Sequence, residues 1–86
     1  MRKGRDVLTI GEMNLKQAEI EVFKSLTNVV ELEFQFIDVG LLEVVLAVKK
    51  GRKQVKRKTM TFDIENVQDL TVVEFRKLIE KTFKGE

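Results

Sequence analysis

The residues of this sequence with the clearest chemical potential form a run of basic side chains, KKGRKQVKRK, at residues 49–58. Seven of its ten side chains are basic and none is acidic. Side chains of this charge can neutralise phosphates and release their condensed counterions, which is the chemistry of nucleic-acid backbone binding. The candidate nucleic-acid-binding residues are Lys49, Lys50, Arg52, Lys53, Lys56, Arg57 and Lys58.

Three interpretations of this basic run stay open. It can contact the backbone of DNA or RNA, it can dock on an acidic protein surface, or it can keep a hairpin tip solvated and protect edge strands from pairing. The run has no Tyr or Trp on which single-stranded bases would stack. Since alternate residues of a strand point to opposite faces, the charges should surround the ribbon. That arrangement favours backbone contact over base recognition.

The net charge of +2 hides a segregation of charge along the chain. Residues 1–5 carry +3, from Arg2, Lys3 and Arg5, and we expect them to form a flexible basic tail. The 71 residues outside this tail and the basic run hold six basic and 14 acidic groups, a net charge of −8. A basic pole on an acidic body can meet an external polyanion or the acidic surface of a second copy.

The rest of the chain offers little catalytic chemistry. It has no His, Cys, Tyr or Trp, and Ser25 is its only serine, so Ser-His and Cys-His pairs are excluded. Zinc lacks its usual ligands, and no glycine-rich phosphate loop occurs. Asp38 and Glu43 are the nearest approach to a carboxylate pair for metal-dependent hydrolysis, but Asp38 is well explained as a turn residue. We therefore predict no enzyme activity, no catalytic residue, no metal site and no cofactor.

The elements that must position the basic run belong to a single α+β domain, predicted over residues 6–86. The expected order is (β)-α-β-β-β-α, with a short first strand at Asp6–Ile10. A helix is predicted over Asn14–Thr27, because Asn14 suits an N-cap and apolar residues recur at helical spacing. Asn28 suits a left-handed conformation after that helix.

Residues 29–36, VVELEFQF, then alternate between apolar and polar, as in a half-buried strand. The three-residue loop Asp38-Val39-Gly40 keeps even positions opposite even positions in the first hairpin. The predicted pairs are Phe36–Leu42, Phe34–Val44, Leu32–Leu46 and Val30–Val48. After a tip at Lys49-Lys50-Gly51, a third strand is predicted over about Lys53–Ile64.

A second helix is predicted to begin at Thr71, which forms a T-x-x-E capping box with Glu74. We expect a three-stranded antiparallel meander with both helices packed on the even face of the sheet. The residues predicted to be most buried are Phe34, Leu46, Phe62, Phe75 and Leu78.

The odd face of the sheet is predicted to be open to solvent and is not entirely polar. Four apolar side chains fall there and form a candidate interface: Leu41, Val45, Ala47 and Val55. Such a patch often marks an interaction surface, for a homodimer or another protein. The alternative is that the N-terminal strand or tail covers it.

The order of elements over residues 14–84 resembles that of double-stranded-RNA-binding domains, which also pack two helices on one face of a sheet. The resemblance covers element order and includes no motif. Those domains begin their last helix with lysine-rich sequence, whereas this chain has TVVEFRKLIE, with Val72, Val73 and Glu74 at that place. The resemblance therefore implies a fold, and RNA binding through the last helix is not carried over.

The longest unbroken apolar run, Val44–Val48, is far below the roughly 18 residues that a membrane span needs. No apolar segment follows the charged start, so we expect no secretory signal, no membrane partner and a cytoplasmic location.

The favoured interpretation is a small accessory or regulatory protein that contacts nucleic acid through the basic run. The alternative is a protein-interaction module or homodimer of the kind found in phages and mobile elements.

Overall fold

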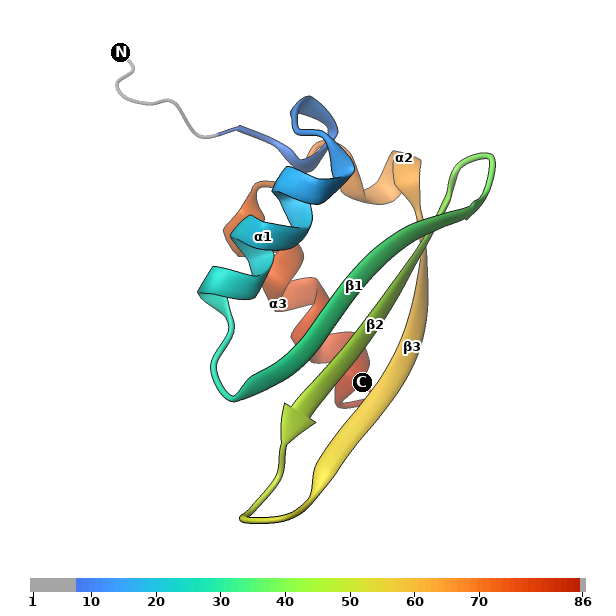
Figure 1. Ribbon diagram of the computed structural model, residues 1–86. Helices are drawn as coiled ribbons and strands as arrows, with labels where there is room; N and C mark the ends of the chain where they lie inside the picture. Colours follow the sequence, from blue (N-terminus) through green and yellow to red (C-terminus); the bar gives the residue numbers. More distant parts are fainter. Residues whose placement is uncertain (1–7, 86) are drawn as a thin grey trace.

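Three antiparallel strands form a sheet in the order β1-β2-β3, and two main helices, α1 and α3, lie on one side of it (Figure 1). This computed structural model describes residues 8–85. The predicted α+β meander is confirmed. The elements are the 3-10 helix η1 (Ile10–Glu12), α1 (Leu15–Ser25), β1 (Val29–Asp38), β2 (Leu41–Lys49), β3 (Val55–Asp63), α2 (Ile64–Val67) and α3 (Val72–Phe83).

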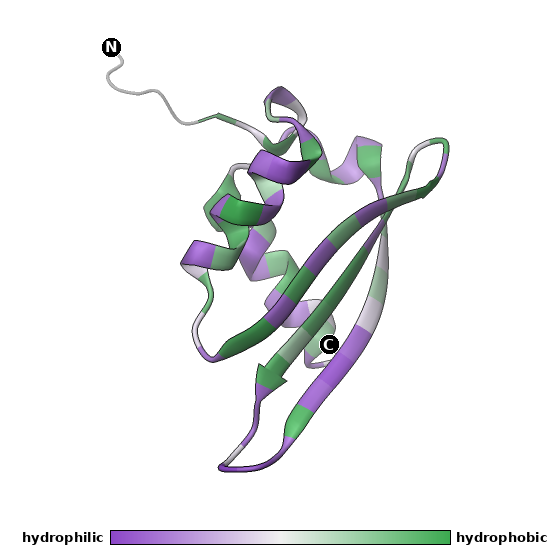
Figure 2. Cartoon of the chain, viewed as in Figure 1, coloured by the Kyte–Doolittle hydropathy of each residue, from purple (hydrophilic) through white to green (hydrophobic). Residues whose placement is uncertain are grey.

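The core lies between the even face of the sheet and the two helices. β2 is almost entirely hydrophobic, whereas the turn that joins it to β3 is hydrophilic (Figure 2). Phe75 of α3 is fully buried at the centre, with its ring centroid 5.7 Å from that of Phe34 and 5.5 Å from that of Phe62. These tilted and edge-on arrangements are the favourable ones for aromatic pairs.

Four of the five predicted core residues are confirmed as buried, and Leu78 is not. Leu78 lies half-buried at the margin of the core, and Ile79 is fully buried in its place. The reason is the spacing of the buried stripe on α3, which runs through Phe75, Ile79 and Phe83 at intervals of four residues.

The strand register confirms three of the four predicted pairs, from Leu32–Leu46 to Phe36–Leu42. The pair Val30–Val48 is wrong, because Val48 lies opposite Val29 and the register shifts before Glu31. This irregularity turns Val30 outward, where it is 47% exposed.

The predicted turn conformations are present. Gly40 and Gly51 have φ angles of 78° and 93°, and Asn28 has a φ of 60°. The first helix ends at Ser25, two residues before the predicted end. The Asn28 carbonyl then accepts a hydrogen bond of 2.8 Å from the Lys49 backbone N–H, which ties the start of β1 to the end of β2.

The strand predicted at residues 6–10 is wrong for residues 8–10, the part of it that the structure describes. Residues 6 and 7, like the predicted tail at 1–5, lie outside the described residues. Thr9 forms only an isolated bridge to Thr71, and Ile10 begins η1. The chain turns there because the backbone N–H groups of Ile10 and Gly11 donate to the carbonyls of Leu70 and Gln68, each at 2.8 Å.

The third strand is shorter at both ends than predicted. Lys53 belongs to the hairpin turn, and Ile64 starts the short helix α2. The Ile64 backbone N–H donates to the Gly40 carbonyl at 2.7 Å, which holds α2 beside the first hairpin turn. No helix within residues 8–85 is long and apolar enough to cross a membrane.

Candidate polyanion-binding hairpin

The turn between β2 and β3 extends past the ends of both main helices (Figure 1). It is closed by a hydrogen bond of 2.8 Å from the Lys50 backbone N–H to the Gln54 carbonyl. Gly51 supplies the left-handed conformation that the turn requires, and no heavy atom beyond its two chain neighbours lies within 4 Å of where its Cβ would be. The sequence thus presents its cations on an uncovered turn.

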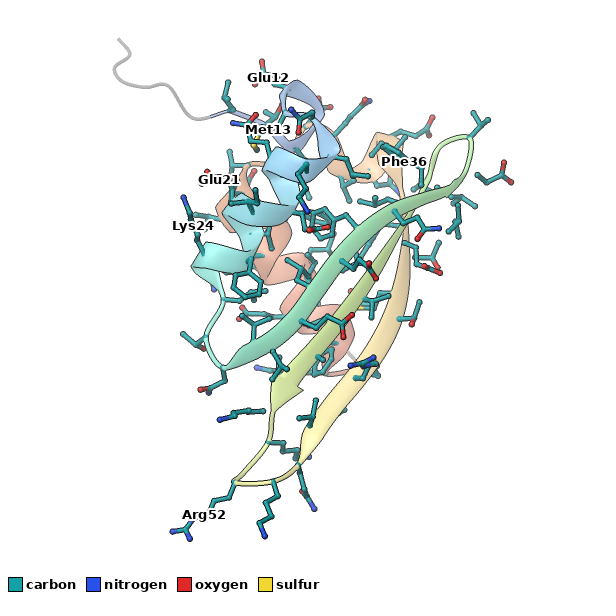
Figure 3. All side chains as sticks on the ribbon, in the orientation of Figure 1. Glu12, Met13, Glu21, Lys24, Phe36 and Arg52 are labelled. Carbon is teal, nitrogen blue, oxygen red and sulfur yellow. The ribbon has the colours of Figure 1, made fainter. Side chains whose placement is uncertain are left out.

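The four cations of the turn are exposed. Arg52 extends from the turn on the side away from the helices (Figure 3). Among the described residues, none of the four lies within ion-pairing distance of a carboxylate. We call this set the tip cations; its members are Lys49, Lys50, Arg52 and Lys53.

Lys58 takes a different place from the tip cations. Its Nζ donates a hydrogen bond of 2.8 Å to the backbone carbonyl of Phe83, at the end of α3, and its side chain lies half-buried. The carbonyl end of a helix carries partial negative charge, so a cation there is stabilising. Lys58 therefore has a structural partner inside the chain.

Lys56 lies on the same face of the sheet, with its Nζ 5.3 Å from the centroid of the Phe83 ring; the corresponding distance for Lys58 is 5.9 Å. Both distances are within the range of cation–π attraction. Lys56 is nevertheless exposed, so its ammonium group stays accessible beside the tip cations.

Arg57 lies on the opposite face and forms an ion pair of 2.7 Å with Glu31. Ala47 of the central strand pairs with both residues, with Glu31 on one side and Arg57 on the other. The ion pair therefore spans Ala47. Five of the seven predicted binding residues remain without a hydrogen bond or ion pair from their side chains to described residues.

The predicted apolar patch on the odd face needs a correction at Ala47. This residue was predicted to be exposed, but it is 0% exposed, because the Glu31–Arg57 pair covers it. Leu41 and Val45 are half-buried, and only Val55, 50% exposed, offers a large open surface. The candidate interface at these four residues stays a prediction, with Val55 as its most exposed member.

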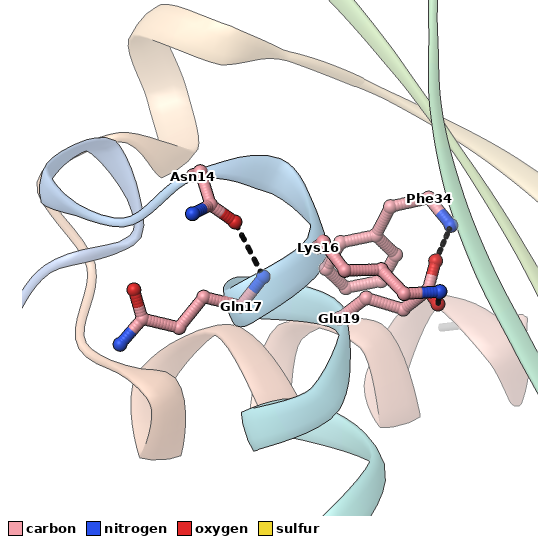
Figure 4. Close-up of polar contacts among 5 residues, drawn as sticks. All are labelled: Asn14, Lys16, Gln17, Glu19 and Phe34. Atoms are coloured by element: carbon pink, nitrogen blue, oxygen red, sulfur yellow. Dashed lines mark hydrogen bonds and ion pairs between the residues drawn. The ribbon is translucent and has the colours of Figure 1, made fainter.

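The outer edge of β1 is also protected. The backbone N–H of Phe34 points away from β2 and donates to Glu19 Oε1 of α1 at 3.0 Å, while Lys16 pairs with Glu19 at 3.6 Å (Figure 4). The same view shows Asn14 capping α1 by accepting from the Gln17 backbone N–H at 2.8 Å, as predicted. A side chain that occupies an edge N–H opposes strand addition there.

Sequence reasoning missed the role of Glu19 as the partner of the Phe34 backbone N–H. The local pattern holds no signal for this contact, since Phe34 is 15 positions away in the chain. Of the carboxylates considered for hydrolysis, Asp38 makes a turn contact: its Oδ1 accepts from the Val39 backbone N–H at 2.7 Å. Within residues 8–85, no three metal-ligating side chains of the Asp, Glu, His and Cys types gather.

In comparisons with protein-family models, curated proteins and solved structures, this chain matched none. The likeness to double-stranded-RNA-binding domains therefore stays one of element order.

Proposed function

We propose that this protein is a small non-enzymatic accessory or regulatory protein that contacts the phosphate backbone of nucleic acid through the tip cations. The observation that carries the proposal is the accessibility of Lys49, Lys50, Arg52 and Lys53 on a turn that extends beyond the helices. Four cations without carboxylate partners among the described residues cost little to bring to a phosphate chain, because no internal ion pair must first be broken.

The same geometry favours binding without base recognition. Arg52 and Gln54 are the turn side chains whose hydrogen-bonding groups match base edges. No aromatic residue lies within the run, so single-stranded bases have no stacking platform there. We therefore expect similar affinities for duplexes of different sequence.

The salt dependence of binding follows from the number of tip cations. Contact with about four phosphates gives a slope of about −3.6 in a plot of log affinity against log salt on duplex DNA. The dissociation constant at physiological salt should be on the order of 1–100 μM, the range of non-specific binding.

The test is fluorescence anisotropy of labelled DNA and RNA duplexes, titrated with protein at several salt concentrations. In the tip variant, Lys50, Arg52 and Lys53 are changed to Gln. In the control variant, Lys16, Lys24 and Lys77 on the helices are changed to Gln, which removes the same charge from the body.

The tip variant should flatten the slope to between about −1 and −2, whereas the control should keep most of the wild-type slope. Equal weakening by both variants would show that only net charge matters. Absence of binding by the wild type at low salt would refute the proposal. The cations of the turn would then serve to keep the protein soluble.

A further inference from the structure

A groove of about 270 Å³ lies beside the hairpin, where the α1–β1 loop, the end of α3 and strands β2 and β3 meet. Its floor is apolar and consists of Leu26, Leu46, Val48 and Phe83. Three of these belong to the hydrophobic core and the fourth, Val48, packs against it, so the floor is held in place by the fold. The volume is slightly below the range of about 300–1,000 Å³ typical of small-molecule pockets and suits a single large side chain.

The rim of the groove is basic. Lys49, Lys50, Lys56 and Lys84 line it, and no described basic side chain on this rim has a carboxylate partner. Glu80 also lines the groove, but its Oε1 is engaged by Arg76 at 3.1 Å. An occupant must therefore combine an apolar part with negative charge around it.

The groove does not suit a nucleotide base. Phe83 is the aromatic residue in its lining, but the ammonium groups of Lys56 and Lys58 lie over its ring. A base would have to displace these cations in order to stack. A Leu or Phe side chain does not need to stack on Phe83, because it can contact Leu26, Leu46 and Val48 while neighbouring carboxylates meet the lysines.

We propose that this groove docks an acidic segment of a partner protein, which inserts one Leu or Phe side chain into the floor and sets carboxylates against the lysine rim. The charge of the rim and the apolar floor together select this chemistry. The inference does not depend on nucleic-acid binding, although Lys49 and Lys50 belong to both surfaces, because the apolar floor adds a contact that a phosphate backbone cannot make.

The probe is an acetylated, fluorescein-labelled peptide of sequence EDELFDED, compared with EDEGSDED, which has the same charge and no apolar anchor. Thr27 lines the groove and is exposed, so Thr27→Trp fills the groove and leaves every charge in place. Val73 is exposed on α3 and does not line the groove, so Val73→Trp is the matched control. Circular dichroism melts check that both variants fold.

The wild type and Val73→Trp should bind EDELFDED at least about tenfold more tightly than EDEGSDED, because burial of the anchor adds to the ionic attraction. Thr27→Trp should lose this preference and keep its affinity for duplex nucleic acid, which separates the role of the apolar floor from that of the tip cations, two of which, Lys49 and Lys50, also belong to the rim. Equal binding of the two peptides, no binding of EDELFDED at low salt, or an unchanged preference in Thr27→Trp would overturn the proposal. A wild type whose self-association is abolished by Thr27→Trp would also overturn it, since the occupant would then be a second copy of this chain.

Discussion

Replacing Lys58 with Met separates the structural part of the basic run from its binding part. The Lys58→Met substitution keeps an unbranched side chain and removes the donor that bonds to the Phe83 carbonyl. A hydrogen bond from a charged donor contributes about 1.5–3 kcal/mol, and a cation at a helix C-terminus contributes about 0.3–1 kcal/mol. Because both figures describe one half-exposed contact, we expect the free energy of unfolding to fall by about 1–2 kcal/mol.

The assay is thermal unfolding followed by circular dichroism. In a domain of this size, each kcal/mol lowers Tm by about 4–8 °C, so Lys58→Met should melt about 5–15 °C below the wild type. Lys53→Met is the matched control. It removes the same charge from an exposed turn, where most substitutions change stability by less than about 0.5 kcal/mol.

The affinity of the same two variants for duplex DNA is then measured at several salt concentrations. Lys53→Met should reduce the magnitude of the slope by about 0.9, the contribution of one phosphate contact, and Lys58→Met should leave it unchanged. If Lys58→Met has the same Tm as the wild type, the structural role of the contact is refuted. If Lys58→Met reduces the magnitude of the slope as much as Lys53→Met does, Lys58 also contacts phosphate.

Two further predictions concern the core and the sheet edge. Phe62→Ala should cost roughly 3–5 kcal/mol in a urea denaturation, a large share of the stability of a small domain, whereas Phe36→Ala, at a position 54% exposed on the same face of the sheet, should cost clearly less; equal costs would contradict the difference in burial between the two side chains. Glu19→Ala should leave the Phe34 N–H at the edge of β1 without its partner, lower stability by about 1 kcal/mol and promote concentration-dependent association in light scattering. A wild type of 10.0 kDa that is already dimeric at low concentration would contradict the protective role of Glu19.

Much of the fold could be predicted because its signals are local. The alternation in VVELEFQF, the glycines at positions 40 and 51, and the capping box of Thr71 and Glu74 each act through residues a few positions apart. Steric limits on φ, the two-residue period of a strand and the unpaired N–H groups at a helix start apply wherever the chain goes. These features therefore match the structure closely.

The sequence by itself determined that a dense run of cations sits on a hairpin turn, because turn chemistry and charge are both readable along the chain. Only the tertiary structure decided which of those cations are accessible. Lys58 is engaged because α3 ends beside β3, 25 positions farther along the chain, and Arg57 is engaged because β1 brings Glu31 across the sheet. The burial of Ala47 beneath that pair has the same origin. Strand alternation tells which face a side chain occupies, but the partner it meets there depends on how distant elements pack, and no local pattern records that.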